Sequence, residues 1–443
     1  MKIYNSLIMK AETGYYLFDS LRNSIHLVDC NFAKLFEGDK FDFDYYYQYI
    51  KDNNIRNIIQ KSDIEISNYY TPKHLVNLFQ NNIGSLTLSV TEKCNMKCIY
   101  CCYHDKFQKY SRSMSWNTAQ KAIDYLLKNS MGREGIHLGF YGGECLIEFE
   151  LIKKCVHYIK NNSICHNIRF GLTTNGLLLK NKNYRDFLSE HDFSVLVSLD
   201  GPKLINDRYR KAKNENESSY EIIINNLKTW RDENPQYFYN RISFNSVLAP
   251  PISYKLLDDF FSNNKIEFTF SSLNKTDYFN VNYCSANQEY FMNLDNDVDL
   301  KYSDTYKKKM LFDYAVFYKL TERSKINSII PGAPCIPGLT RIYVNIDEEI
   351  YPCEKITEDE NNRIGTLDVG VEPQKVINII NRYIKNANKK CKDCWAWELC
   401  EMCFINMEMP CDNTKKNISK KFIYYIDHIK DNKEAIDYIE KII

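Results

Sequence analysis

The chain has 443 residues, enough to build two or three hydrophobic cores of ordinary size. Its 58 basic and 57 acidic residues leave a net charge of +1, which argues against nucleic acid or an anionic membrane as a partner. With 44% hydrophobic residues and no apolar stretch near the roughly 20 residues of a membrane span, we expect a folded, cytoplasmic protein.

Sixteen cysteines need a chemical explanation, because a reducing cytosol disfavours structural disulfides. Eleven of them fall in two groups, four at residues 94–102 and seven in the last quarter of the chain. This distribution predicts two separate metal regions.

Residues 1–82 are predicted to form a small α+β domain. The strand candidates are 2–8, 15–18 and 24–28, and helix-like stretches follow at 31–36, 43–51 and 72–80. This pattern resembles the small domains that capture leader peptides of ribosomally made, modified peptides, in which an extended peptide completes a sheet edge. The alternative is a purely structural cap.

From residue 83 to 305, strand runs alternate with amphipathic helices, which predicts an α/β fold with a partial (βα)6 TIM barrel. The strand candidates are 86–90, 136–140, 168–172, 194–199, 242–247 and 266–270. The helix candidates are 118–128, 146–160, 184–188, 219–230 and 255–261. Residues 271–304 are polar and lack periodicity, so we expect a surface excursion there.

The first barrel strand is followed by Cys94, Cys98 and Cys101 in a C-x3-C-x2-C loop. Three thiolates on one loop can hold three corners of a [4Fe-4S] cluster and leave the fourth iron without a protein ligand. Active sites of barrels lie at this end of the strands, so such a cluster would do chemistry. The alternatives are reduced cysteines in a turn or a partial zinc site.

This loop resembles the signature of radical S-adenosylmethionine (radical SAM) enzymes, with Tyr100 in the aromatic position before the third cysteine. Other residues that resemble family motifs follow the next strands: Gly142, Gly143, Glu144, Asn175 and Ser198. The resemblance implies that Glu144 holds the methionine amino group of the cofactor and that Asn175 and Ser198 line its pocket. Arg210 could pair with the methionine carboxylate. Each motif alone could be ordinary turn chemistry.

The resemblance also implies the reaction. The cluster, reduced by a donor such as flavodoxin or ferredoxin, would cleave S-adenosylmethionine to methionine and a 5′-deoxyadenosyl radical. Such a radical abstracts hydrogen from carbon, so the site must exclude water and competing donors.

A bridging helix is expected within residues 306–334, followed by a cysteine-rich domain over 335–443 that ends in a helix. Its spacing, Cys391-x2-Cys394-x5-Cys400-x2-Cys403 and then Cys411, resembles the SPASM extension, which binds one or two auxiliary [4Fe-4S] clusters. A zinc ribbon is the alternative, although its cysteine pairs usually lie further apart.

By resemblance, Cys391, Cys394, Cys400 and Cys411 would hold a distal cluster. Cys335, Cys353 and Cys403 would hold most of a proximal one, with Cys284 or a substrate thiolate as the fourth ligand. The chain departs from the family in the C-x2-C step at 400–403 and in having Glu348 where the family has glycine. Glu354 directly follows Cys353, at the place of an aspartate thought to be a base in sulfatase maturases. A surface glutamate is the alternative.

These features predict a radical SAM maturase that installs a crosslink in a ribosomally made precursor peptide. A cysteine thioether is the first candidate for this crosslink. The first alternative is an anaerobic sulfatase maturase, which generates formylglycine. The second is a noncatalytic iron–sulfur electron carrier, which would not need a pocket for S-adenosylmethionine.

Overall fold

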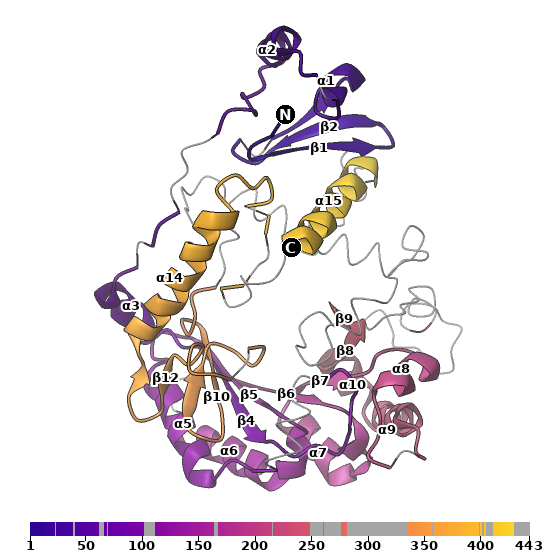
Figure 1. Cartoon of the computed structure of the whole chain (residues 1–443). Helices are drawn as coiled ribbons and strands as arrows, with labels where there is room; N and C mark the ends of the chain where they lie inside the picture. The colour runs from indigo at the N-terminus through magenta and orange to yellow at the C-terminus, as the bar shows by residue number, and fades with distance from the viewer. Residues whose placement is uncertain are drawn as a thin grey trace. The chain divides into compact units, whose positions relative to one another are not determined.

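The computed structural model divides into two compact units. Unit 1 comprises Met1–Thr71, Lys307–Cys335 and Ile377–Ile443, and unit 2 comprises Pro72–Tyr306 and Ile336–Val376 (Figure 1). The structure describes residues 1–22, 24–38, 40–61, 66–68, 70–101, 111–163, 167–214, 216–248, 260, 276–280, 335–356, 358–397, 399–400, 403–404 and 411–428. The strand predicted at 266–270, the helix at 306–334 and Cys284 lie outside the described residues, as does nearly all of the helix predicted at 255–261.

Unit 2 is built on a ten-stranded sheet of order β13-β12-β11-β10-β4-β5-β6-β7-β8-β9. All neighbours from β10 to β9 are parallel, so the parallel α/β architecture is confirmed. The parallel strands are β10 (Arg341–Val344), β4 (Ser85–Thr91), β5 (Gly135–Gly142), β6 (Asn167–Thr174), β7 (Ser194–Ser198), β8 (Ile242–Leu248) and β9 (Thr276–Asn280).

Five of the six predicted barrel strands coincide with β4 to β8. The expectation of irregular structure throughout 271–304 is wrong at β9, which pairs with β8. Tyr278 and Phe279 have high strand propensity, but the polar residues around them hide the apolar signal of a short strand.

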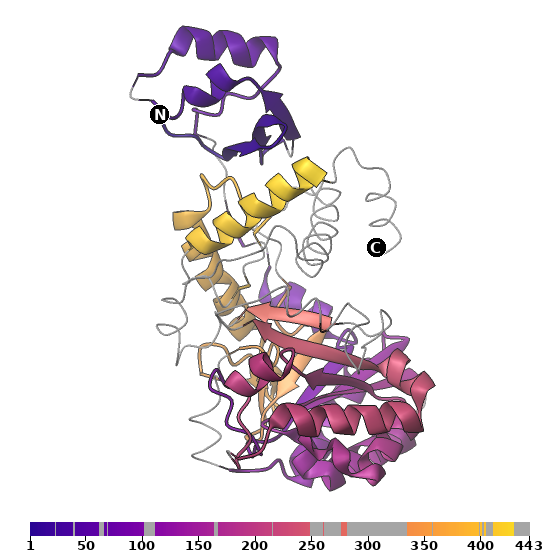
Figure 2. The same ribbon diagram turned by 90° about the vertical axis from the view of Figure 1, so that its right-hand side faces the viewer.

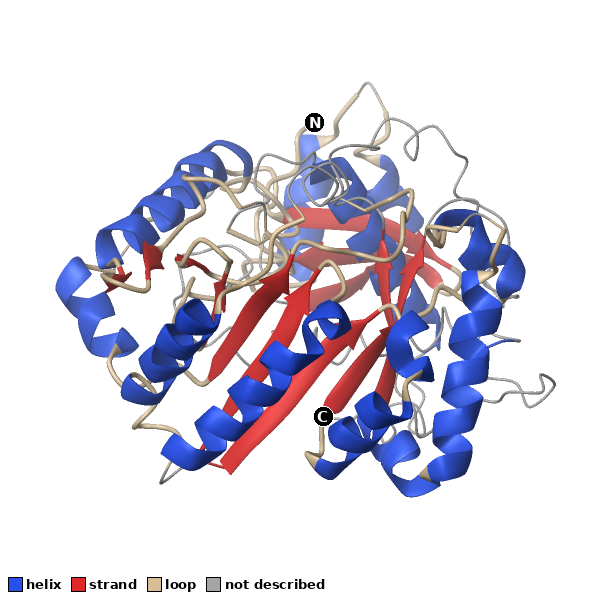
Figure 3. Ribbon diagram, turned by 90° about the horizontal axis from the view of Figure 1, so that it is seen from below, coloured by secondary structure: helices blue, strands red, loops and turns tan. Residues whose placement is uncertain are grey.

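Helices lie against the sheet of unit 2 (Figure 3). Helix residues such as Ile123 and Val156 and strand residues such as Leu88 and Phe140 are fully or almost fully buried, as is typical of apolar helix faces packed on a sheet. The helices are α3 (Pro72–Phe79), α5 (Trp116–Lys128), α6 (Phe149–Asn162), α7 (Lys182–Glu190), α8 (Lys203–Tyr209), α9 (Ser219–Glu233) and α10 (Pro235–Arg241), with short 3-10 turns η1 (Cys145–Glu148) and η2 (Leu177–Lys180).

Three short strands extend the sheet beyond β10: β11 (Glu349–Tyr351), β12 (Gly365–Thr366) and β13 (Gly370–Val371). They pair antiparallel. Residues 336–376, which the sequence grouped with the cysteine-rich domain, therefore continue the sheet of the barrel. Helix α14 (Pro373–Lys390) begins in unit 2 and continues into unit 1.

Unit 1 joins the two ends of the chain. Its three-stranded antiparallel sheet consists of β1 (Ser6–Ala11), β2 (Gly14–Asp19) and β3 (Ser24–Val28). Helices α1 (Cys30–Lys34) and α2 (Phe43–Asp52) cover one face, and α15 (Cys411–His428) covers the other (Figure 2). Because successive strand residues point to opposite faces, Leu17 packs with α1 and α2 while Phe18 packs with α15.

The sheet's two faces explain why the N-terminal segment is not a separate domain in space. Two strands and a short edge strand are marginal on their own, and α1 and α2 cover only one face. The second face is buried by Ile418, Phe422 and Ile426 of α15. No helix in the described part of the chain is long and apolar enough to cross a membrane.

Phe422→Ala tests this shared core. The Phe422 ring is 4% exposed and its centroid lies 4.6 Å from that of Phe18. We expect the variant to lose about 3–5 kcal/mol of stability, measured as faster amide hydrogen exchange in β1 and β2. Leu27→Ala is the control, because Leu27 is 65% exposed and should change stability by less than about 0.5 kcal/mol. Unchanged exchange in Phe422→Ala would contradict the packing described.

Candidate active site

The cysteine loop is closed at its base by backbone hydrogen bonds. The Met114 amide donates to the Val90 carbonyl at 2.9 Å, and the Glu92 amide donates to the Arg112 carbonyl at 2.9 Å. The Thr91 hydroxyl also donates to the Arg112 carbonyl, at 3.2 Å. The chain that leaves β4 therefore returns to the same place, and the loop is held at the carboxyl end of the strand.

A second set of backbone contacts fixes the middle of the loop. The Lys97 amide donates to the Lys211 carbonyl at 2.8 Å, and the Ile99 amide donates to the Tyr209 carbonyl at 2.9 Å. Met96 and Ala212 form an antiparallel β-bridge next to these hydrogen bonds. Residues 95–99 thus pair with the segment after α8, although more than 100 residues separate them along the chain.

Gly142 and Gly143 hold the loop from the β5 side. The Gly143 amide donates to the Thr91 carbonyl at 2.8 Å, and a Cβ on Gly143 would lie 2.3 Å from the Lys93 carbonyl oxygen. Gly142 has φ +127°, and its Cβ would lie 2.3 Å from the Thr91 carbonyl oxygen. Glycine is required here for the approach of one backbone to another. The close neighbour of both glycines is the 91–93 backbone.

The carboxylate of Glu144 is buried, at 1% exposure. One oxygen, Oε1, accepts from the Thr174 hydroxyl at 2.8 Å and the Leu146 amide at 3.1 Å, and Oε2 accepts from the Asn175 amide at 2.7 Å. Burial raises the pKa of Glu144, and these hydrogen bonds oppose the rise. None of the ion pairs between described residues includes Glu144. A buried carboxylate without a cation in contact suits the ammonium group of a ligand.

Asn175 connects Glu144 to the cysteine loop. Its side-chain amide donates to Asn95 Oδ1 at 2.7 Å and lies 4.0 Å from the sulfur of Cys94. The predicted residues of β4, β5 and β6 are thus brought together. Ser198 ends β7, is 8% exposed and pairs in register with Asn245 of β8.

Tyr100, Asp200 and Arg210 form a buried group on the other side of the loop. The Tyr100 hydroxyl donates to Asp200 Oδ2 at 2.6 Å, and Arg210 Nε lies 3.1 Å from Asp200 Oδ1. The guanidinium carbon lies 5.7 Å from the centroid of the Tyr100 ring. Burial lowers the pKa of Arg210, but Asp200, Tyr100 and Cys98 together outweigh this effect, so the net shift is upward and the group stays a cation. A ligand carboxylate, the partner expected for Arg210 from the sequence, would therefore have to share the guanidinium with Asp200, which already neutralises its charge.

The three loop thiols are close enough to interact electrostatically. Burial raises the pKa of Cys94 to about 11 and that of Cys98 to about 12, and the Arg210 charge opposes the rise at Cys98. Iron would displace the thiol protons on binding. Within the described residues, no three His, Cys, Asp or Glu side chains converge as ligands of one metal ion. A [4Fe-4S] cluster does not require this, because each thiolate binds a different iron.

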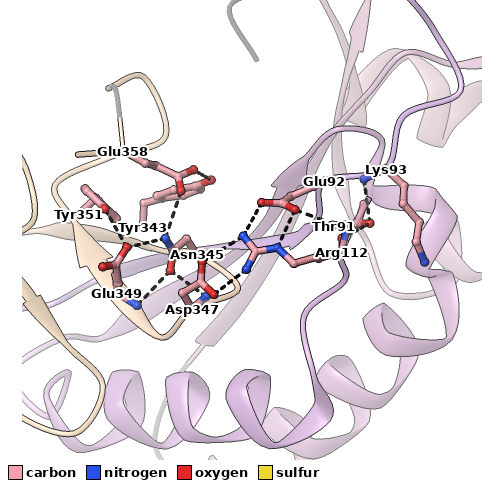
Figure 4. Close-up of polar contacts among 10 residues, drawn as sticks. All are labelled: Thr91, Glu92, Lys93, Arg112, Tyr343, Asn345, Asp347, Glu349, Tyr351 and Glu358. Carbon is pink, nitrogen blue, oxygen red and sulfur yellow. Dashed lines mark hydrogen bonds and ion pairs between the residues drawn. The ribbon is translucent and has the colours of Figure 1, made fainter. Parts of the chain in front are cut away.

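A polar network beside the cysteine loop was missed by sequence reasoning (Figure 4). Arg112 donates to Glu92 through Nε at 3.0 Å and Nη2 at 2.9 Å, and to Asp347 through Nη1 at 2.9 Å and Nη2 at 3.2 Å. Glu92 is 2% exposed and stands two residues before Cys94. Arg112 therefore ties the start of the cluster loop to the turn between β10 and β11. No local sequence pattern predicts an ion pair between residues that lie more than 200 positions apart in the chain.

Glu348, which stands where the family has glycine, lies in the same turn. Its φ is +62°, a left-handed conformation that favours glycine. The Glu348 side chain is fixed by an ion pair with Lys121 at 2.9 Å and a hydrogen bond from Thr118 at 3.2 Å. The turn thus has the backbone conformation expected for glycine, with a glutamate held by α5 in its place.

Glu354 is half-buried in unit 2, where its charge raises the pKa of His137 while burial, the larger effect, lowers it. His137 lies on β5 beside Gly139 and Gly171, where a Cβ would come within 3.1 Å and 2.6 Å of the imidazole. The glycines make room for the ring, so His137 belongs to the inner face of the sheet. Sequence reasoning overlooked it because a lone histidine in a strand carries no signature.

The C-terminal cysteines lie in unit 1, apart from Cys353, which lies in unit 2. The Cys391 thiol interacts electrostatically with Cys394, Cys400 and Cys411, the four proposed for the distal cluster. Trp397, between Cys394 and Cys400 in sequence, is 8% exposed, and its indole nitrogen has no hydrogen-bond acceptor among the described residues. Cluster and thiolate sulfurs accept such bonds, so these residues fit an iron–sulfur cluster. The proximal set, which consists of exposed Cys335 and half-buried Cys353 and Cys403, stays a prediction.

Comparison with known proteins identifies the domain that carries the loop. Residues 88–260 match the model of the radical SAM superfamily. The chain therefore contains a radical SAM domain, which is an enzyme domain, and its cofactors are a [4Fe-4S] cluster and S-adenosylmethionine.

Three curated relatives are informative. An uncharacterized protein of Methanocaldococcus jannaschii is 38% identical over 31% of this chain and 46% of its own length. The radical SAM cyclopropyl synthase TigE of Paramaledivibacter caminithermalis is 25% identical over 60% of this chain and 59% of its own. A cysteine-type anaerobic sulfatase-maturating enzyme of Clostridium novyi is 24% identical over 76% of this chain and 92% of its own. The chain thus spans about half the length of the first two.

A solved structure shares the fold. The enzyme anSMEcpe, with bound AdoMet and Kp18Cys peptide, aligns with a TM-score of 0.56 at 18% identity. The alignment covers 81% of this chain and 99% of that one.

Glu348 gives a test of the turn that precedes Cys353. Glu348→Gly should be more stable than Glu348→Ala by about 1–2 kcal/mol, because both lose the Lys121 contact and only alanine keeps the left-handed strain. Urea unfolding of unit 2 measures the difference. At Glu150 in the first turn of α6 the order should reverse, since glycine weakens an ordinary helix by about 1 kcal/mol relative to alanine. A Gly variant at 348 no more stable than the Ala variant would contradict this account.

Proposed function

We propose that this protein is a radical SAM maturase that installs a crosslink, with a cysteine thioether as the first candidate, in a ribosomally made precursor peptide. The observation that carries the catalytic part is the junction of Glu144, Asn175 and the Cys94 loop at the carboxyl ends of β4, β5 and β6. When bound, the cluster and S-adenosylmethionine supply a 5′-deoxyadenosyl radical that abstracts hydrogen from the substrate.

Cys94, Cys98 and Cys101 would hold the cluster, and a flavodoxin or ferredoxin would reduce it. Glu144 would accept the ammonium of the cofactor's methionine, because its Oε2 takes only one hydrogen bond from described residues and a carboxylate oxygen can accept two. Asn175 would keep Glu144 in register with Cys94. Gly142, Gly143 and Ser198 would shape the pocket, and Tyr100 and Arg210 would close it opposite Glu144.

Peptide capture would take place in unit 1. Within the described residues β3 pairs with β2 alone, so its outer edge offers backbone groups for an added strand. Leu27 of β3 is 65% exposed and gives that edge an apolar contact. The leader of the precursor would extend the sheet, and the core peptide would enter the barrel.

The auxiliary clusters would accept the electron that the crosslink releases or bind the substrate thiolate. Cys391, Cys394, Cys400 and Cys411 are the proposed distal ligands, and Cys335, Cys353 and Cys403 belong to the proximal set. Glu354, the residue after Cys353, would take a substrate proton.

A second candidate is an anaerobic sulfatase maturase. The relative from Clostridium novyi and the fold shared with anSMEcpe favour it. Glu354 in place of the aspartate, and the N-terminal sheet, favour the first candidate.

Replacing Cys94, Cys98 and Cys101 together by alanine should abolish cleavage of S-adenosylmethionine, because no thiolate would remain to hold the cluster. Formation of 5′-deoxyadenosine under reducing, oxygen-free conditions measures this. Replacing Cys391 and Cys394 is the matched control, and it should spare cleavage uncoupled from peptide modification. Release of 5′-deoxyadenosine by the triple variant would refute the cluster assignment.

Two peptides separate the candidate functions. The reconstituted enzyme should remove two hydrogens from a short cysteine-containing peptide encoded beside its gene, leaving a crosslink that tandem mass spectrometry can locate. A peptide with a sulfatase motif should stay unchanged. Formylglycine on the second peptide would establish the sulfatase maturase instead.

A further inference from the structure

Asn5 joins the N-terminal sheet to the loop between Cys391 and Cys394. The Asn5 side-chain amide donates to the carbonyls of Lys392 at 2.9 Å and Cys394 at 3.5 Å, and its backbone amide donates to the Asp393 carbonyl at 3.1 Å. Asn5 has no exposed surface. The bonds reach all three residues from 392 to 394, so the side chain sets the course of this part of the loop.

Asn5 is itself held from the sheet side. Its carbonyl accepts from the Ser20 amide at 2.9 Å and from the Ser20 hydroxyl at 2.8 Å. Its φ of +53° lies in the left-handed region, which asparagine tolerates better than most residues. The position therefore needs both a tolerated left-handed backbone and an amide with two N–H donors.

Apolar contacts continue the same connection. Ala396 and Leu399 of the cysteine loop are 2% and 3% exposed and belong to the core formed by β1, β2 and α15. Cys394 is partly buried against that core. Ligand loop and sheet thus share one packed interior, which transmits a change at either side to the other.

We propose that Asn5 is a positioning residue for the auxiliary cluster, and that cluster occupancy and the order of the β1–β3 sheet are thermodynamically linked. The inference rests on the proposed auxiliary cluster and deepens it. A cluster that binds the 392–394 loop in the conformation set by Asn5 also stabilises the elements that hold this conformation, which include the sheet. By reciprocity, a peptide that stabilises the sheet would favour the loaded cluster by the same factor.

Asn5→Gly isolates the side chain, because glycine keeps the left-handed backbone and removes only the amide. In the full-length protein reconstituted without oxygen, we expect loss of one cluster's worth of iron while the signal of the radical SAM cluster remains. Iron analysis and electron paramagnetic resonance measure the two. The control is Asn54→Gly, since Asn54 has φ +52° in the same unit but is exposed. Full iron in Asn5→Gly would overturn the positioning role.

The linkage is tested in the other direction by hydrogen exchange. Cys394→Ser should speed exchange of the β1 and β2 amides at least tenfold, whereas Cys98→Ser, in the radical SAM loop, should leave them unchanged. Equal exchange in both variants would overturn the linkage. Wild-type protein holding iron for one cluster only would instead refute the proposed auxiliary cluster, so the two failures can be told apart. If Cys394→Ser does not fold, exchange in Asn5→Gly gives the same comparison with every cysteine present.

Discussion

The active site depends on one buried negative charge, the carboxylate of Glu144. It accepts hydrogen bonds from Leu146 of η1 and from Thr174 and Asn175 at the end of β6, so one side chain fixes the relative positions of these two segments. A buried carboxylate is costly unless its oxygens are satisfied. The same bonds that meet this cost place the Asn175 side chain against the cluster loop. Removing the charge would leave three donors without their acceptor at the place where the cofactor binds.

The loop itself is held from three sides by backbone atoms. Its base closes on residues 112–114, its middle pairs with 209–213, and its first residues pack against Gly142 and Gly143. These contacts join backbone atoms, and the Met96 amide also donates to Cys94 Sγ at 3.4 Å, as amides do to the thiolates of iron–sulfur clusters. Arg112 braces the base toward the β10–β11 turn.

Unit 1 shows how the two ends of one chain become a single module. The three-stranded sheet is too small to stand alone, and a C-terminal helix supplies the apolar surface that it lacks. This arrangement brings the proposed peptide-binding edge and the proposed distal ligands into one packed structure. A functional connection between recognition and redox chemistry would need no further element.

Much of this molecule was determined by local sequence. Strands β4 to β8 carry short apolar runs that alternate with amphipathic helices, so their positions could be predicted. The cysteine spacing and the motifs after the strands indicated the site. These signals depend only on residues that are neighbours in sequence. Tertiary structure decided the rest. Strand β9, the short strands β10–β13, the Arg112 bridge, the room for His137 and the contact of Asn5 with the 392–394 loop depend on partners far away in the chain. A side chain's own neighbours in sequence say nothing about such partners, since only folding brings them within hydrogen-bonding distance.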